Sequence, residues 1–113
     1  MGAGSITCLS GQFGSRPAAD AVVTSAMHAA VETLAKGLAL ELAPLRVNAV
    51  APGLIDTPLL GDFRDQGAEW ASGTLPVGRI GRPQDVAQTV MMLMTNDFIT
   101  GEVVHVDGGG RYV

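Results

Sequence analysis

The alternation of two kinds of segment constrains the fold of this chain most. Three short apolar segments rich in β-branched residues, 5–10, 46–50 and 102–106, predict strands. Between them, in 21–43 and 83–95, apolar residues recur every three or four positions, which predicts helices. Strands that alternate with helices form parallel sheets through right-handed crossovers, and apolar strands suit a sheet covered on both faces. The pattern therefore predicts an α/β fold with three parallel strands and crossover helices.

The ends and buried faces of both helices can be predicted from single residues. We expect Asp20 to cap the start of the first helix and Pro44 to end it. Pro83 fits the first position of the second helix, and Asn96 fits its C-terminal cap. The first helix is expected to bury an apolar stripe of Val23, Met27, Ala30, Val31, Leu34, Leu38 and Leu42. The second is expected to bury Val86, Val90, Leu93 and Met94.

The connecting segments contain the glycine and proline residues that are typical of loops. Glycine and proline mark a loop at 11–19, and 107–110 contains a run of three glycines that predicts a sharp turn. Residues 57–72 suggest a partly helical excursion that contains Phe63 and Trp70. These two aromatic side chains either line a pocket or anchor the excursion, and the sequence leaves both interpretations open.

Size and composition restrict the class of protein. At 113 residues, the chain is predicted to be one globular domain, 1–113, with 47% hydrophobic and 16% charged residues. A net charge of −4 argues against a nucleic-acid or anionic membrane partner. No apolar run is long enough to span a bilayer, and residues 1–9 lack the pattern of a signal peptide. Cys8 is the single cysteine, which precludes an internal disulfide and favours a cytoplasmic location.

Three motifs, in order, carry a resemblance to a known family. They are "LALELAPLRVNAVAPGLIDTP" (38–58), "PVGRIGRPQDVAQTVMMLM" (76–94) and "ITGEVVHVDGGG" (99–110). Together they resemble the C-terminal half of a short-chain dehydrogenase/reductase (SDR). The resemblance implies a partial Rossmann fold, a doubly wound fold that binds NAD or NADP. The N-terminal cofactor half of that fold, with its glycine-rich turn against the pyrophosphate, has no counterpart in the sequence.

The positions that the resemblance assigns to catalysis hold other residues here. The family uses a serine, then a tyrosine and a lysine four residues apart on the long helix. In this chain these positions are Gly11, Thr24 and His28, so no catalytic residue is predicted. The tyrosine acts as acid and base because the lysine cation lowers its pKa from about 10. A threonine hydroxyl is far too weak an acid to replace it, although His28 could hydrogen-bond a ribose or titrate near neutral pH.

One family segment is retained after the second strand. By resemblance, Pro52, Gly53 and Ile55 would border the nicotinamide, and Thr57 would hydrogen-bond its carboxamide or the phosphates. The alternative is that Pro52-Gly53 is a turn that ends the strand. Because the glycine-rich turn is absent from the sequence, neither NAD nor NADP is expected to bind tightly.

Two hypotheses on function follow. The first is an SDR-like fragment without conventional redox activity, acting as an oligomeric structural or ligand-binding remnant. The second is a divergent NAD(P)-dependent oxidoreductase completed by another chain, with His28 as its acid. Cys8, His28 and His105 lack ligand spacing, so no metal site is predicted. We expect a homo-oligomer, because the first strand and the first helix would each leave apolar surface uncovered. The substrate is a small molecule that the sequence does not identify.

Overall fold

The structure is a computed structural model, and it describes residues 4–113. Residues 1–3, on which part of the comparison with a signal peptide rests, lie outside the described residues. The element order confirms the predicted α/β fold with three parallel strands. The main elements are β1 (Ser5–Leu9), α1 (Val22–Glu41), β2 (Arg46–Pro52), α2 (Arg64–Thr74), α3 (Pro83–Thr95) and β3 (Val103–Val106).

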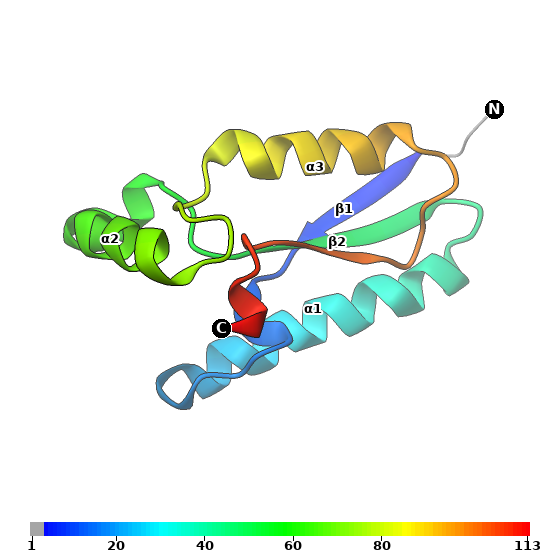
Figure 1. The fold of residues 1–113 in the computed structure, drawn as a ribbon. Coiled ribbons are helices and arrows are strands. Elements are labelled where there is room, and N and C mark those ends of the chain that lie inside the picture. The colour runs from blue at the N-terminus through cyan, green and yellow to red at the C-terminus, as the bar shows by residue number, and fades with distance from the viewer. Residues whose placement is uncertain (1–3) are drawn as a thin grey trace.

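The sheet has the order β1-β2-β3, and both pairs of neighbouring strands are parallel. Ile6 lies opposite Val47, and Val50 lies opposite Val104, which fixes the register of the two ladders. Figure 1 shows α1 against one face of the sheet and α3 against the other, with α2 beyond the C-terminal ends of the strands. The site described below lies at that end of the sheet.

The centre of the core is β2, which is buried from Arg46 to Ala51. It is buried because it has a strand on each side and a helix on each face. On the α1 face, Ala35 and Ala39 pack against Val47 and Ala49. These short side chains allow α1 to lie close to the strands, so much of the core volume comes from the sheet.

The apolar stripe predicted for the buried face of α1 is largely wrong, although Leu38 packs against the core as predicted. Val23, Met27 and Leu34 are 73%, 62% and 56% exposed. The buried residues of α1 are instead Ser25, Ala35 and Ala39. At 3.6 residues per turn, these two sets fall on opposite sides of the helix. Hydrophobicity alone points to the wrong face, because the sheet accepts only small residues at close approach.

The predicted ends of α1 also need correction. Asp20 does not cap the helix: it lies in a 3-10 turn, η2 (Ala19–Ala21), and the N-cap is Ala21. The hydroxyl of Ser25, within the helix, bonds the segment that precedes it instead. It accepts from the Ala18 backbone N–H at 3.3 Å and donates to the Ala21 carbonyl at 2.6 Å. At the other end α1 stops at Glu41, ahead of Pro44.

Helix α3 begins at Pro83 and has Asn96 as its C-cap, as predicted, but Met94 is 52% exposed rather than buried. The end of α3 is organised by Arg46 instead. Its guanidinium donates to the carbonyls of Leu93 at 2.7 Å, Met94 at 2.9 Å and Ile99 at 3.1 Å. A cation at this position satisfies carbonyls that a helix end leaves unpaired and opposes the negative end of the helix dipole.

Asn48 fixes the turn that leads into β3. Its side chain is fully buried; Nδ2 donates to the Ile99 carbonyl at 3.0 Å, and Oδ1 accepts from the Glu102 backbone N–H at 3.0 Å. Both bonds hold the segment between α3 and β3 against β2. A buried amide with both ends paired is stabilising, whereas its loss would leave backbone groups unsatisfied.

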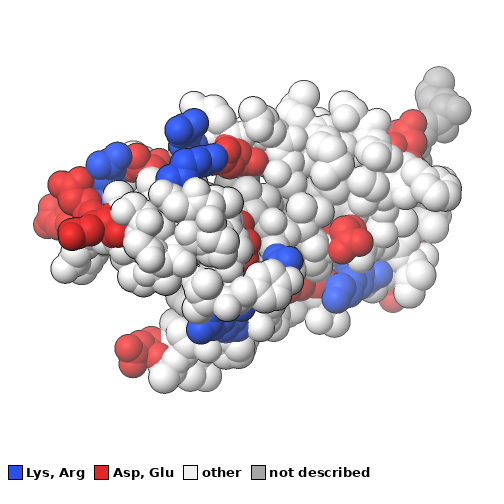
Figure 2. Space-filling model, in the orientation of Figure 1, with Lys and Arg blue, Asp and Glu red and all other residues white. Residues whose placement is uncertain are grey.

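Charged side chains are unevenly distributed over the surface. Figure 2 shows mixed acidic and basic side chains around the end of the molecule that contains α2, and wide uncharged areas elsewhere on the same face. Among residues 4–113, no helix combines the length and apolar character that a membrane crossing requires.

Candidate functional site

A cavity of about 650 Å³ opens where β1 and β2 end. Its walls come from the loop after β1, from the segment after β2, and from α1 and the start of α3. The lining is mainly apolar, with Leu9, Phe13, Leu60 and Val86 among its side chains. The cavity brings together six of the residues singled out from the sequence: Gly11, His28, Pro52, Gly53, Ile55 and Thr57.

Gly11 and His28 are in direct contact at the inner corner of this cavity. A Cβ placed on Gly11 would lie 2.6 Å from Nδ1 and 2.7 Å from Nε2 of His28, and closer still to Cε1. The imidazole therefore lies over the glycine, where a larger residue would have to displace it. The ring also stacks on Phe13, with centroids 6.0 Å apart and planes 7° apart.

The polar atoms of His28 have no partner in the described residues. Nδ1 is buried without a hydrogen bond, and no hydrogen bond to Nε2 is found among residues 4–113. A buried ring nitrogen without a partner is unfavourable, because it has lost water and gained nothing in exchange. His28 is therefore the polar group that a bound molecule could pair with in this corner.

The remaining position aligned with a catalytic residue, Thr24, lies outside the cavity. Thr24 is exposed on α1, one helical turn before His28, and does not line the cavity. Ser10, the neighbour of Gly11, does line it, but its hydroxyl donates to Glu32 Oε2 at 2.8 Å. Sequence reasoning gave no role to Glu32, although its spacing of four from His28 places both on one face of α1.

The segment after β2 forms the opposite wall. The Gly53 backbone N–H donates to the Val106 carbonyl at 2.9 Å, and a Cβ on Gly53 would lie 2.9 Å from Cα and Cβ of Asp107. Close packing against Asp107 thus explains the glycine, and the hydrogen bond to Val106 continues the pairing of β2 with β3. Thr57 also lines the cavity, and its hydroxyl makes no hydrogen bond within residues 4–113.

This wall is held in place by a short parallel bridge between Ile55 and Gly81. The Asp56 N–H donates to the Gly81 carbonyl, and the Gly81 N–H donates to the Leu54 carbonyl, both at 2.9 Å. Arg64 pairs with Asp56 at 3.0 Å, and this hydrogen-bonded guanidinium lowers the pKa of the Asp56 carboxyl below its usual value. The excursion from 57 to 74 is thereby tied back to the wall of the cavity.

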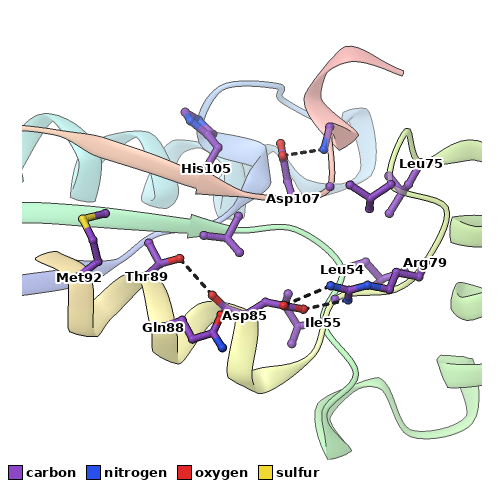
Figure 3. A pocket seen from close by; sticks show the side chains of 15 residues that line it. Leu54, Ile55, Leu75, Arg79, Asp85, Gln88, Thr89, Met92, His105 and Asp107 are labelled. Carbon is purple, nitrogen blue, oxygen red and sulfur yellow. Dashed lines mark hydrogen bonds and ion pairs between the residues drawn. The ribbon is translucent and has the colours of Figure 1, made fainter.

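A second cavity, of about 520 Å³, lies between α3 and the end of β3 (Figure 3). Arg79 donates to both oxygens of Asp85, at 2.9 and 3.2 Å, and Asp85 also accepts from the Arg82 backbone N–H at 2.7 Å. The Arg79 hydrogen bonds, followed by the Arg82 N–H, lower the pKa of Asp85 to about 2. Nε2 of His105, on β3, is buried without a partner. The charged pair of this cavity is therefore satisfied within the protein, whereas Nε2 of His105 is not.

The aromatic side chains of the excursion line a further cavity of about 420 Å³, with Leu54, Leu60 and Gly67. Both Phe63 and Trp70 contribute, so the pocket interpretation of the two residues has a structural basis. No three His, Cys, Asp or Glu side chains of residues 4–113 gather in a way that could hold a metal ion.

Comparison with known proteins gives consistent results. Residues 1–111 match a family model described as enoyl-(acyl carrier protein) reductase. The chain is 38% identical over 110 residues to the uncharacterized oxidoreductase YmfI of Bacillus subtilis, covering 94% of this chain and 46% of that protein. It is 39% identical over 108 residues to carbonyl reductase family member 4 of Danio rerio, covering 94% of this chain and 44% of that protein.

Solved structures show the same relation. A small-chain dehydrogenase crystallised in complex with NADPH superimposes with a TM-score of 0.91 at 39% identity, covering 96% of this chain and 52% of that one. The chain thus spans about half the length of the relatives it matches. With the family model, the curated relatives and the fold in agreement, the chain belongs to the short-chain dehydrogenase/reductase family.

Proposed function

We propose that this chain is an SDR-derived unit that binds a small apolar molecule in the cavity at the ends of β1 and β2, without conventional redox activity of its own. The observation that carries the proposal is the 650 Å³ cavity, in which His28 is the one ring with unpaired nitrogens among mainly apolar walls. Cavities of this size and character are typical of small-molecule sites. The ligand class is an uncharged apolar compound with one hydrogen-bonding group, such as a ketone or alcohol.

The absence of redox activity is proposed from the residues at the family's reactive positions. Gly11 offers no hydroxyl, and the Ser10 hydroxyl is engaged by Glu32. Thr24 is exposed and is too weak an acid to protonate a developing alkoxide. His28 could supply a proton, but neither of its nitrogens is oriented by a carboxylate within the described residues. General acid catalysis needs both a matched pKa and a fixed geometry.

The fit of a nicotinamide cofactor to these residues is partial. Pro52, Ile55 and Thr57 line the cavity and could contact a nicotinamide, and the free Thr57 hydroxyl could pair with its carboxamide. Gly53 is less suited, because its Cα faces Asp107. A cofactor bound here would supply a hydride. The 113 residues contain no glycine-rich turn after a strand for its pyrophosphate, so we propose that binding by this chain is weak.

Ligand binding can be tested by amide NMR during a titration with cyclohexanone. Saturable shifts are expected at Gly11, Gly53 and Thr57, which line the proposed site, and not at Gly108 and Gly109, which line the second cavity. NADPH added with the ketone should not be consumed. Shifts confined to the second cavity, or no shifts, would refute the proposed site.

The alternative, a divergent oxidoreductase completed by another chain, is favoured by one observation: His28 lies inside the cavity, where an acid would be needed. It requires that a second protein supply the pyrophosphate site. Carbonyl-dependent consumption of NADPH in the presence of such a protein, abolished by His28→Ala, would support the alternative over the binding unit.

We also propose that the chain self-associates through the outer face of α1. The exposed side chains of Val23, Met27 and Leu34 point away from the sheet and form an apolar stripe along the helix, with Ala30 between them. Exposed apolar surface of this kind favours association. A closed dimer would use the same stripe on both copies, since most homo-oligomers are symmetric.

A further inference from the structure

A separate region of the surface contains two arginine side chains, Arg16 and Arg111, although the net charge of the chain is −4. It lies where the loop after β1, α2 and the C-terminal residues meet, around a cavity of about 310 Å³. Arg16 and Arg111 both line it, and they come from opposite ends of the sequence.

Arg16 is bound only weakly within the protein. Its Nη1 donates to the Gly110 carbonyl at 3.1 Å, and its guanidinium forms no ion pair with a carboxylate of residues 4–113. A neutral carbonyl holds the side chain in position but leaves its charge uncompensated. The remaining N–H groups of the guanidinium are therefore available to a ligand.

Arg111 is also incompletely neutralised. Its Nη1 lies 3.8 Å from Asp107 Oδ2, which is beyond hydrogen-bond distance. Asp107 is already engaged, since Oδ1 accepts from the Gly109 N–H at 3.0 Å and Oδ2 accepts from the Arg111 N–H at 3.2 Å. The guanidinium instead lies over the Tyr112 ring, 4.8 Å from its centroid. Figure 2 shows basic atoms beside the C-terminal segment, apart from the mixed charges around α2.

The rest of the cavity wall is mainly apolar, although the side-chain amide of Gln12 also lines it. Phe13, Pro17, Trp70 and Val113 line it together with the two arginines. A site with a guanidinium pair at one side and aromatic rings at the other suits a molecule with two dissimilar ends. Arginine pairs with carboxylate and phosphate oxygens through two parallel hydrogen bonds, and the rings can contact an apolar body.

We propose that this corner binds an organic oxyanion, a carboxylate or phosphate group attached to an apolar body, through Arg16 and Arg111. The proposal does not rest on the ligand proposed for the cavity beside His28, because Arg16 and Arg111 do not line that cavity. Phe13 and Gln12 line both cavities, so a ligand in one cavity would contact residues that also line the other.

The test is a titration with cyclohexanecarboxylate, followed by the fluorescence of Trp70, the single tryptophan of the chain. Cyclohexanecarboxylate does not absorb where tryptophan does, so the signal reports binding directly. We expect saturable binding, at least tenfold weaker binding of the neutral analogue cyclohexylmethanol, and weaker binding of inorganic phosphate, which has no apolar body. Equal binding of cyclohexylmethanol, or phosphate binding as tight as that of the carboxylate, would overturn the assignment.

Variants locate the site. Arg16→Gln and Arg111→Gln should each weaken carboxylate binding at least fivefold. Arg16→Lys keeps the charge but loses the planar guanidinium, so its affinity should lie between those of the unaltered chain and Arg16→Gln. Arg82→Gln removes the same charge from an exposed position outside this cavity and should bind like the unaltered chain. Unchanged binding in both Arg16→Gln and Arg111→Gln, with amide spectra showing folded protein, would refute the proposal.

Discussion

Replacing Gly11 with alanine tests the contact on which the shape of the cavity depends. The added methyl would lie 2.6 Å from Nδ1 and 2.7 Å from Nε2 of His28, far inside van der Waals contact. The backbone itself permits alanine, because φ at Gly11 is −170°, an extended value open to any residue. The cost therefore arises from displacing the imidazole and not from backbone strain.

The magnitude follows from two costs and one opposing gain in stability. Overpacking a filled site costs about 1–3 kcal/mol, and losing the stack between Phe13 and His28 costs about 0.5–1.5 kcal/mol. Alanine also lowers the conformational entropy of the unfolded chain, which offsets about 0.4–1 kcal/mol of this loss of stability. We expect Gly11→Ala to lower the free energy of unfolding by about 1–3 kcal/mol.

A double-mutant cycle isolates the contact. His28→Ala empties the space that the new methyl needs, so Gly11→Ala should cost much less in that background, with a coupling of about 1–2 kcal/mol between the two sites. Urea unfolding followed by circular dichroism gives the four stabilities. The control is Gly37→Ala on α1, where an added Cβ meets nothing within 4 Å and should stabilise the helix. Additive costs, or a Gly11→Ala variant as stable as the Gly37→Ala control, would refute the reasoning.

Three further predictions concern stability and association. Arg46→Met should lower the free energy of unfolding by at least about 2 kcal/mol in urea titrations, because it leaves buried carbonyls at the end of α3 without donors. Arg79 lowers the pKa of Asp85 from 3.8 to about 2. The ion pair therefore stabilises the fold above about pH 4, and this stabilisation is lost as the pH falls towards 2. The urea midpoint of the unaltered chain should fall over that pH range, and Asp85→Asn should make this fall smaller. Met27→Glu should lower the mass measured by light scattering towards that of a monomer, with the circular dichroism unchanged. Leu40→Glu, an exposed position outside the stripe, should leave that mass unchanged. Equal association of both variants would contradict an α1 interface.

The order and type of the elements could be predicted because periodicity reports them directly. The three strands and α3 fall within a few residues of their predicted ranges, and Pro83 and Asn96 mark α3 at both ends. The face of α1 could not be predicted in the same way. Alanine and serine carry little hydrophobic signal, yet at close approach to a sheet their small size matters more than their polarity.

The candidate site was predictable in part. Motif positions located His28, Gly11 and the Pro52–Thr57 wall, and the structure brings them to one cavity. The stacking of Phe13 on His28 and the bond from Ser10 to Glu32 were not predictable, because they join a loop to a helix through tertiary packing. The role of Arg46 at the end of α3 was missed for the same reason: its partners are backbone carbonyls nearly fifty residues away.

We propose that this chain keeps part of the SDR fold and a ligand cavity, and that by itself it binds a dinucleotide only weakly. Calorimetric titration of the chain with NADPH tests this proposal. We predict a dissociation constant no tighter than about 1 mM, or roughly −4 kcal/mol. Micromolar binding of NADPH by this chain alone would contradict the account.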